Sequence, residues 1–154
     1  YRVRSNQESR AIAGLSMGGY GSFLYSLHHP DMFCACAPLS AAVFDDSVMD
    51  TRKAKSHKDL FNRLFGPGDE HWHKNSVEKI LSDWDENKLP NIRYYIDCGD
   101  KDGLLDGNFQ VHQIMRQKNI KHEFRVRGGG HSWTYWRTAL PEVLKFVSQT
   151  FSRS

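Results

Sequence analysis

The stretch AIAGLSMGGYGS, which begins at residue 11, places a serine between glycines at the end of an apolar run. A serine hydroxyl is a weak nucleophile, and it needs a neighbouring base and a site for the developing oxyanion. The pattern G-x-S-x-G meets this need where a strand turns sharply into a helix. Gly14, Ser16 and Gly18 fit the pattern, and Gly19 adds a further residue without a Cβ atom to clash at the turn. We therefore predict that Ser16 is a nucleophile and that the backbone N–H of Met17 is an oxyanion donor.

A base and an orienting carboxylate should follow the nucleophile in the order Asp, His, each just past the carboxyl end of a strand. The run CGDKDGLLDGN offers Asp100, Asp102 and Asp106, and the run GGGHSWTYW offers His131. Asp106 lies near a predicted helix start, where a carboxylate commonly caps the helix, and Asp97 lies within a predicted strand. Spacing alone favours His131 as the base and leaves Asp100 and Asp102 as alternatives for the carboxylate.

The segments that must position these side chains alternate between strands and helices. Apolar runs predict strands over residues 10–14, 33–40, 92–99 and 122–128. Apolar residues at helical spacing predict helices over residues 20–27, over 107–118 with Asn119 as the stop, and from Pro141 to Phe151. In the last helix, the expected buried face comprises Leu140, Val143, Leu144, Val147 and Phe151. Strands that alternate with helices predict an α/β fold with a mostly parallel sheet.

Residues 42–90 differ from this alternation and form a predicted helical insert. One amphipathic pattern covers residues 60–65, and a second begins at Val77 after the capping pair Asn75 and Glu78. Residues 66–75 between them are polar and are expected to form a loop. From its length and its helices, we expect the insert to cap the carboxyl ends of the strands and to shape the substrate pocket.

The composition of the 154 residues is that of a globular protein, with 39% apolar and 25% charged residues. The net charge of +3 is small and the basic residues are scattered, so we expect no nucleic-acid partner. No apolar run approaches the roughly 20 residues that a membrane span needs. Cys34, Cys36 and Cys98 are expected to be buried free thiols, and His71 and His73 lack a third ligand at suitable spacing. We therefore expect no metal site, no cofactor and no membrane partner.

Three motifs in this order, RAIAGLSMGGYGS, CGDKDGLLDGN and GGGHSWTYW, resemble those of the putative-esterase family of α/β-hydrolases. This family includes feruloyl esterases and acetylxylan esterases of carbohydrate esterase family 1, S-formylglutathione hydrolases and mycolyltransferases. The resemblance covers essentially the whole chain. It implies a triad of Ser16, Asp102 and His131, in which Asp102 matches the aspartate of the family's CGxxDxL pattern. It also matches Trp133 and Trp136 to the family's H-x-W-x-x-W pattern and implies that Trp133 contacts substrate.

Within the family, the motifs favour the carbohydrate-esterase branch. The segment APLSAAVFDD differs from the PWG-type segment of S-formylglutathione hydrolases, and Gly18 stands where mycolyltransferases tend to have alanine. The resemblance thus implies a serine esterase that forms an acyl-enzyme from acyl or feruloyl esters of plant carbohydrate, a small-molecule or oligosaccharide ester. Alternatives are an S-formylglutathione hydrolase-like or general short-chain esterase, an acyltransferase, and an inactive truncated scaffold or binding module. The family also favours a secreted or periplasmic location.

The family places about four further strands before the nucleophile strand, and one of their loops supplies a second oxyanion donor. In this chain, Tyr1–Ser9 alone precede that strand. Residues 1–154 are therefore expected to form a single esterase domain that corresponds to the C-terminal half of an α/β-hydrolase fold. The strand at residues 10–14 would then be an exposed edge, which we expect the N-terminal half or an associating chain to cover.

Overall fold

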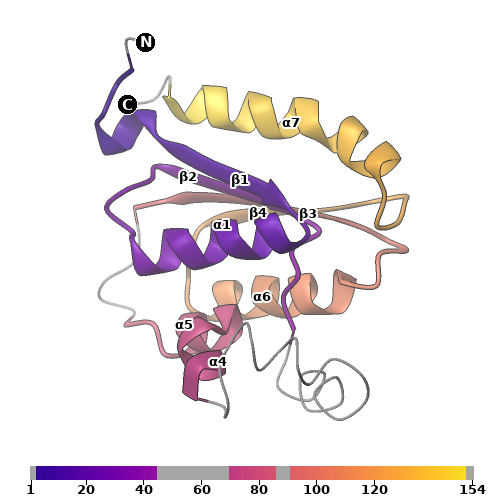
Figure 1. The fold of residues 1–154 in the computed structure, drawn as a ribbon, viewed down its shortest axis with the longest axis horizontal. Helices are drawn as coiled ribbons and strands as arrows, with labels where there is room; N and C mark the ends of the chain where they lie inside the picture. Colours follow the sequence, from indigo (N-terminus) through magenta and orange to yellow (C-terminus); the bar gives the residue numbers. More distant parts are fainter. Residues whose placement is uncertain (1–2, 45–69, 86–90, 152–154) are drawn as a thin grey trace.

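The computed structural model describes residues 3–44, 70–85 and 91–151, and these residues contain a four-stranded sheet (Figure 1). The strands lie in the order β1 (Ala11–Leu15), β2 (Ala35–Leu39), β3 (Arg93–Gly99) and β4 (His122–Arg127). Every neighbouring pair is parallel, so the carboxyl ends of all four strands meet at one edge. The predicted parallel α/β sheet is confirmed, and each strand agrees with its predicted bounds to within two residues.

Helices cover both faces of the sheet (Figure 1). The helices α1 (Met17–His28) and α6 (Leu105–Gln117) lie on one face, and α7 (Trp133–Phe151) lies on the other. Side chains of β3 alternate between these layers, because successive residues of a strand point to opposite faces. Tyr94 and Ile96 join the buried cluster of α1 and α6, whereas Tyr95 joins the cluster of α7. A short 3₁₀ helix, η1 (Gln7–Ser9), precedes β1.

The expectation for the last helix is wrong at its start and in part of its buried face. The helix α7 begins at Trp133, eight residues before Pro141, and the proline lies inside it. Leu140 and Leu144 are 48% and 59% exposed, and the buried residues are Tyr135, Trp136, Ala139, Val143, Phe146 and Thr150. A proline inside a helix removes one backbone hydrogen bond. The burial of Tyr135 and Trp136 on the sheet favours the continuous helix despite that loss.

Two expectations for the insert are also wrong. Residues 70–75 form a helix, α4 (Glu70–Asn75), where a loop was predicted, because Trp72 is buried and anchors this turn. The helix α5 (Val77–Ser82) is capped by Ser76 and not by Asn75, since the Ser76 hydroxyl accepts a hydrogen bond from the N–H of Lys79. The predicted helix at residues 60–65 lies outside the described residues.

The described part of the insert does not cap the strand ends. Val77 and Leu81 of α5 are buried in the cluster that also holds side chains of α1 and α6. In Figure 1, α4 and α5 accordingly lie against the helical layer on one face of the sheet. This part of the insert therefore extends the hydrophobic core and does not enclose the site that the strand ends form.

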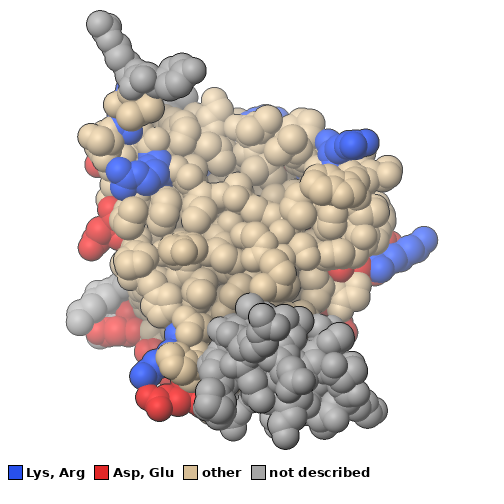
Figure 2. Space-filling view, viewed as in Figure 1, with Lys and Arg blue, Asp and Glu red and all other residues tan. Residues whose placement is uncertain are grey.

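Within the described residues, β1 pairs with β2 alone and forms one edge of the sheet. Figure 2 shows the molecule from the side of this edge, where charged side chains lie around the periphery and the middle is uncharged. An uncharged strand edge is a surface that other chains can pair with. That an N-terminal half or an associating chain covers residues 10–14 stays a prediction.

The helices that the structure describes include none with both the length and the apolar character of a membrane span. The three cysteines are free thiols. Cys36 and Cys98 are buried as expected, and Cys34 is only partly buried. Burial raises the pKa of the Cys36 thiol to about 12, which keeps it protonated and unreactive at neutral pH.

Candidate active site

Ser16 occupies the tight turn between β1 and α1. Its backbone lies in the left-handed region at φ 56° and ψ −119°, which costs a non-glycine residue about 1–3 kcal/mol. Three backbone hydrogen bonds hold this conformation. The Ser16 N–H donates to the Leu39 carbonyl at 2.9 Å, and the Ser16 carbonyl accepts the N–H groups of Tyr20 at 3.0 Å and Ala42 at 2.9 Å. The serine is therefore fixed at the carboxyl edge of the sheet, as the motif predicts.

The glycines around Ser16 have different roles. A Cβ atom at Gly14 would overlap the carbonyl of Gly18, and one at Gly19 would press against the backbone of Leu39 and Ala41. A Cβ atom at Gly18 would meet nothing within 4 Å, apart from its own helix. The expectation that Gly18 also avoids a Cβ clash is therefore wrong. The close approach of β1 to the start of α1 depends on Gly14.

Replacing Gly14 by alanine is expected to destabilise the fold by about 1–3 kcal/mol, the usual effect of overpacking against atoms that cannot move aside. Gly18→Ala is the matched control, because the structure leaves space for its methyl group. Urea unfolding of the two variants measures the difference. Equal midpoints for both variants would show that the turn is not held as tightly as described.

Met17 is the first residue of α1, so its backbone N–H belongs to the donors that have no partner within the helix. The helix also presents the positive end of its dipole there. A negative charge that develops beside the Ser16 hydroxyl would therefore meet a backbone donor at this position. This placement agrees with the oxyanion role predicted for Met17.

The side chains of Ser16, His131 and Asp102 form a continuous chain of hydrogen bonds. His131 Nε2 lies 2.9 Å from Ser16 Oγ, and His131 Nδ1 lies 3.1 Å and 3.0 Å from the two carboxylate oxygens of Asp102. A carboxylate only accepts hydrogen bonds, so the proton of a neutral imidazole lies on Nδ1. Nε2 is then free to accept the proton of the serine hydroxyl.

The structure separates the two aspartates that spacing leaves open. The Asp102 side chain is fully buried against His131, and its Oδ1 also accepts the N–H of Leu104 at 2.9 Å. Asp100 instead accepts the N–H of Gly129 at 2.8 Å, in the loop that carries His131. Asp102 therefore orients the imidazole directly, and Asp100 supports the loop.

Asn108 connects two loops of the site through hydrogen bonds. It was not identified as a site residue from the sequence. Its side chain is fully buried, accepts the N–H of Ala41 at 3.3 Å, and donates to the carbonyls of Ala41 and Leu104 at 2.9 Å and 2.8 Å. The loop after β2 and the loop of Asp102 are thus tied together. A signal is present in the sequence, since Asn108 shares a helical face with the apolar Val111 and Met115.

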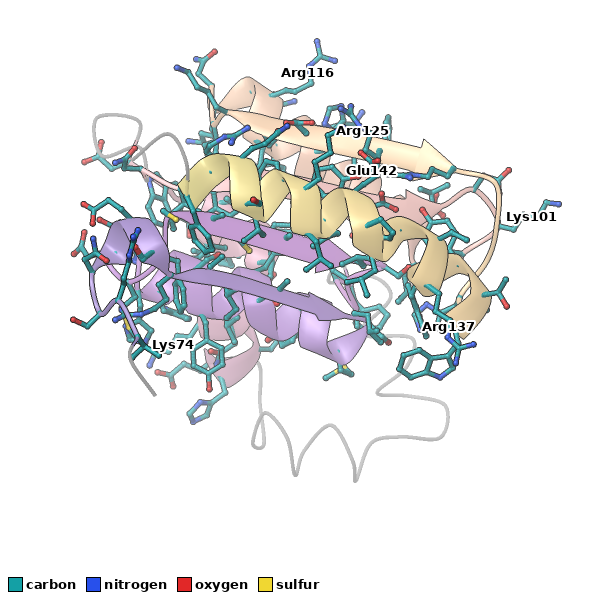
Figure 3. The ribbon with its side chains drawn as sticks, turned by 90° about the horizontal axis from the view of Figure 1, so that it is seen from above. Lys74, Lys101, Arg116, Arg125, Arg137 and Glu142 are labelled. Atoms are coloured by element: carbon teal, nitrogen blue, oxygen red, sulfur yellow. The ribbon has the colours of Figure 1, made fainter. Side chains whose placement is uncertain are left out.

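Trp136 of α7 lies against His131, and Trp133 lies against Trp136. The Trp136 ring meets the His131 ring edge-on at 4.8 Å between centroids, and its Nε1–H donates to Ser40 Oγ at 3.1 Å. Trp133 packs against Trp136 at 5.4 Å and remains 63% exposed. An apolar depression of about 220 Å³ adjoins both rings and reaches β1; its lining includes Ala13, Gly14, Leu15, Leu39 and Leu140. Figure 3 shows Arg137, which also lines it, at the end of the molecule toward which the strands point.

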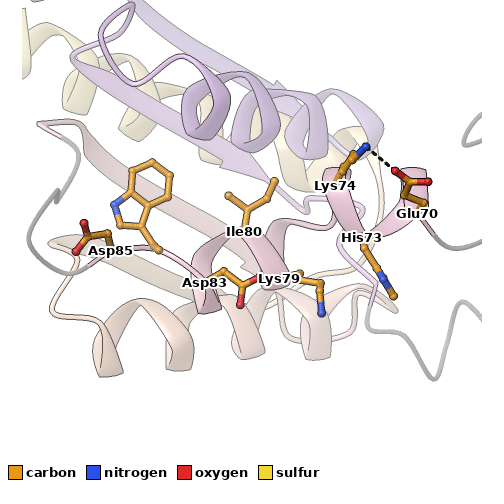
Figure 4. Close-up of a pocket in the computed structure, with 8 residues that line it drawn as sticks. Glu70, His73, Lys74, Lys79, Ile80, Asp83 and Asp85 are labelled. Carbon is orange, nitrogen blue, oxygen red and sulfur yellow. Dashed lines mark hydrogen bonds and ion pairs between the residues drawn. The ribbon is translucent and has the colours of Figure 1, made fainter.

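A second depression lies away from these side chains, on α4 and α5 (Figure 4). Charged residues dominate it, among them Glu70 and Lys74, which form an ion pair at 2.8 Å. It contains none of the three hydrogen-bonded residues Ser16, His131 and Asp102. Across the described ranges, no cluster of three or more histidine, cysteine or acidic side chains could hold a metal ion.

Three known proteins are similar to this chain over almost its whole length. An acetyl esterase of Caldicellulosiruptor saccharolyticus is 25% identical over 97% of this chain and 58% of its own length. The structure of a ferulic acid esterase superposes with a TM-score of 0.80 and 37% identity, over 98% of this chain and 55% of that one. An S-formylglutathione hydrolase of Staphylococcus aureus shares the fold, with a TM-score of 0.77 and 24% identity over 96% of this chain and 57% of that one.

The chain thus spans between 55% and 58% of the length of these three proteins. A family model described as "Putative esterase" matches residues 1–147, which is nearly the whole chain. The parallel sheet, the strained serine turn and the order of the three motifs agree with that match. The chain belongs to the putative esterase family of α/β-hydrolases.

Proposed function

We propose that this protein is a serine carboxylic-ester hydrolase. The observation that carries the proposal is the hydrogen-bonded chain from Asp102 through His131 to Ser16, on a turn that exposes the hydroxyl. As Ser16 Oγ attacks the ester carbonyl, His131 Nε2 takes its proton, and Asp102 stabilises the imidazolium that forms. The N–H of Met17 donates to the oxyanion.

The second half of the reaction uses the same groups. His131 returns the proton to the leaving alcohol, which departs and leaves the acyl group on Ser16 Oγ. Water then takes the place of the alcohol, and His131 accepts its proton as it attacks the acyl carbon. The acid is released and the Ser16 hydroxyl is restored.

For the substrate, we propose acyl or feruloyl esters of plant carbohydrate. The exposed Trp133 ring, which packs on the Trp136 ring beside His131, offers a surface for an aromatic acyl group near the nucleophile. The names of the acetyl esterase and the ferulic acid esterase that this chain resembles support acetyl and feruloyl groups as the acyl part of the substrate. In this proposal Trp133 binds the acyl group and has no part in proton transfer.

Trp133→Ala in the full-length protein is expected to raise KM for methyl ferulate by about two- to twelvefold, because an aromatic pair contributes about 0.5–1.5 kcal/mol. KM for p-nitrophenyl acetate, which has no aromatic acyl group, should change little. Phe109→Ala is the control, since Phe109 is an aromatic residue of similar exposure that contacts Phe124 on another part of the surface. Equal effects on both esters would contradict the role of Trp133, and faster turnover of S-formylglutathione than of methyl ferulate would favour the S-formylglutathione hydrolase alternative.

A further inference from the structure

Asp97 is a fully buried carboxylate that the reaction does not use. It lies within β3, five residues before Asp102, and its side chain has no exposure to solvent. A buried charge is costly unless it is paired and hydrogen-bonded. The role of the Asp97 carboxylate can therefore be inferred from the side chains that pair with it.

Three side chains surround the Asp97 carboxylate. Tyr135 donates its hydroxyl to Oδ1, Tyr95 donates to Oδ2 at 3.1 Å, and an Arg127 guanidinium nitrogen lies 2.9 Å from Oδ2. The same arginine donates to the Tyr95 hydroxyl at 2.6 Å. Burial, together with the hydrogen bond to Asp97, raises the pKa of Tyr135, so that its hydroxyl stays protonated as a donor.

Two of these partners enclose the loop that carries His131. Arg127 is the last residue of β4, and Tyr135 lies in the first turn of α7, so the loop of residues 128–132 runs between them. Both ends of this loop are thus bound to one carboxylate. Tyr95 comes from β3 and connects the carboxylate to the sheet.

The middle of the loop is fixed by contacts that depend on this arrangement. Gly129 has a positive φ of 145°, and a Cβ atom there would overlap the Tyr135 ring. The Gly129 N–H donates to Asp100, and its carbonyl accepts the N–H of Lys101 at 2.9 Å. Figure 3 shows Lys101 at the end of the molecule toward which the strands point, and Asp102 follows it in sequence. The Tyr135 ring therefore packs directly on Gly129, and two hydrogen bonds join Gly129 to the residues between β3 and Asp102.

We infer that Asp97, with Tyr135 and Arg127, forms a positioning device that holds His131 within hydrogen-bond reach of Ser16 and Asp102. This inference rests on the proposed function for its catalytic consequence. In this inference these residues act only through the loop and take no part in proton transfer. A displacement of about 1 Å in a reacting group can lower a rate about 10²-fold, so a loop held at both ends matters for kcat.

The test compares Tyr135→Phe, which removes the hydroxyl and keeps the ring, with Asp97→Asn in the full-length protein. Tyr94→Phe is the matched control. Tyr94 is also a buried tyrosine, it lies in β3 like Asp97, and its side chain packs on the other face of the sheet, with α1 and α6. The first readout is the low-field proton resonance of His131 Nδ1–H, assigned by its absence in His131→Gln. The second is the pair of kcat and KM for p-nitrophenyl acetate, with urea unfolding to confirm that each variant is folded.

In Tyr135→Phe, the resonance should broaden or disappear and kcat should fall about tenfold with KM nearly unchanged, as expected for a misplaced base. Tyr94→Phe should keep the resonance and the wild-type kcat. A Tyr135→Phe variant with lower unfolding stability but wild-type kcat and resonance would overturn the inference, since its hydroxyl would then only stabilise the fold. If the wild-type protein hydrolyses no ester, the proposed function fails, and the resonance alone still decides whether the device holds His131.

Discussion

Ser16→Ala is expected to lower kcat for ester hydrolysis by a factor on the order of 10⁵–10⁶, the size of effect that loss of an activated serine has in enzymes of this mechanism. The variant removes the atom that forms the acyl-enzyme and leaves the turn in place. Its backbone bonds to Leu39, Tyr20 and Ala42 do not involve the hydroxyl. Substrate binding and unfolding stability should therefore change little while turnover is lost.

The measurement is the initial rate of p-nitrophenyl acetate hydrolysis by wild-type protein and by Ser16→Ala, purified in parallel. Ser22→Ala is the control, because Ser22 lies in α1 and its hydroxyl donates to the Gly18 carbonyl in the same helix. That variant should keep its rate to within about threefold, because its hydroxyl lies outside the Ser16–His131–Asp102 chain and the lost hydrogen bond contributes only about 0.5–1.5 kcal/mol to stability. Unchanged turnover in Ser16→Ala would contradict the assignment of the nucleophile.

Asp102→Asn is expected to lower kcat by about 10⁴-fold at neutral pH. An asparagine can turn its amide group toward His131 Nδ1 and donate to it, which places the imidazole proton on Nε2 instead. Nε2 then cannot accept the proton of Ser16. Because Asp102 and asparagine have nearly the same shape, the loss should come from the tautomer and not from unfolding.

Asp100→Asn separates the two aspartates that the sequence leaves as alternatives. The oxygen of the new amide can still accept the N–H of Gly129, which is the bond that Asp100 makes. The expected change in kcat is therefore small, within about fivefold, as for removal of charge from an intact hydrogen bond. A large loss in Asp100→Asn with little loss in Asp102→Asn would reverse the assignment of the triad acid.

The fold was largely predictable because its strands carry their own signal. Runs such as IRYYIDCG are apolar on both faces, as strands of a parallel sheet between two helical layers must be. The stop at Asn119 was also visible, and the structure gives this residue a positive φ of 55°. The strands and the helix stop at Asn119 could thus be predicted, because the local sequence determines them.

The start of α7 was not predictable from local sequence. Pro141 is a strong helix-start signal, yet the helix begins at Trp133 because Tyr135 and Trp136 are buried against the sheet. Contacts with distant strands decide this boundary, and the local pattern does not contain them. The same reason explains α4, whose single buried residue Trp72 is surrounded by polar neighbours in sequence.

The residues of the candidate triad were predictable from the sequence, but the buried network around Asp97 was not. Ser16 and His131 follow from motifs, and the choice of Asp102 followed from the family resemblance and not from spacing. Two partners of Asp97, Arg127 and Tyr135, lie 30 or more residues away from it along the chain, and no sequence periodicity links them to it. Such a network becomes visible only when the strands and α7 are placed together.

Labelling with a fluorophosphonate tests most directly whether Ser16 is a nucleophile activated by His131. The folded full-length protein is treated with the probe, and peptide fragmentation by mass spectrometry locates the adduct. The predicted result is a single adduct on Ser16, absent in Ser16→Ala and formed far more slowly in His131→Gln, which cannot take the serine proton. An adduct on another residue, or no adduct on a folded and otherwise intact protein, would contradict the assignment.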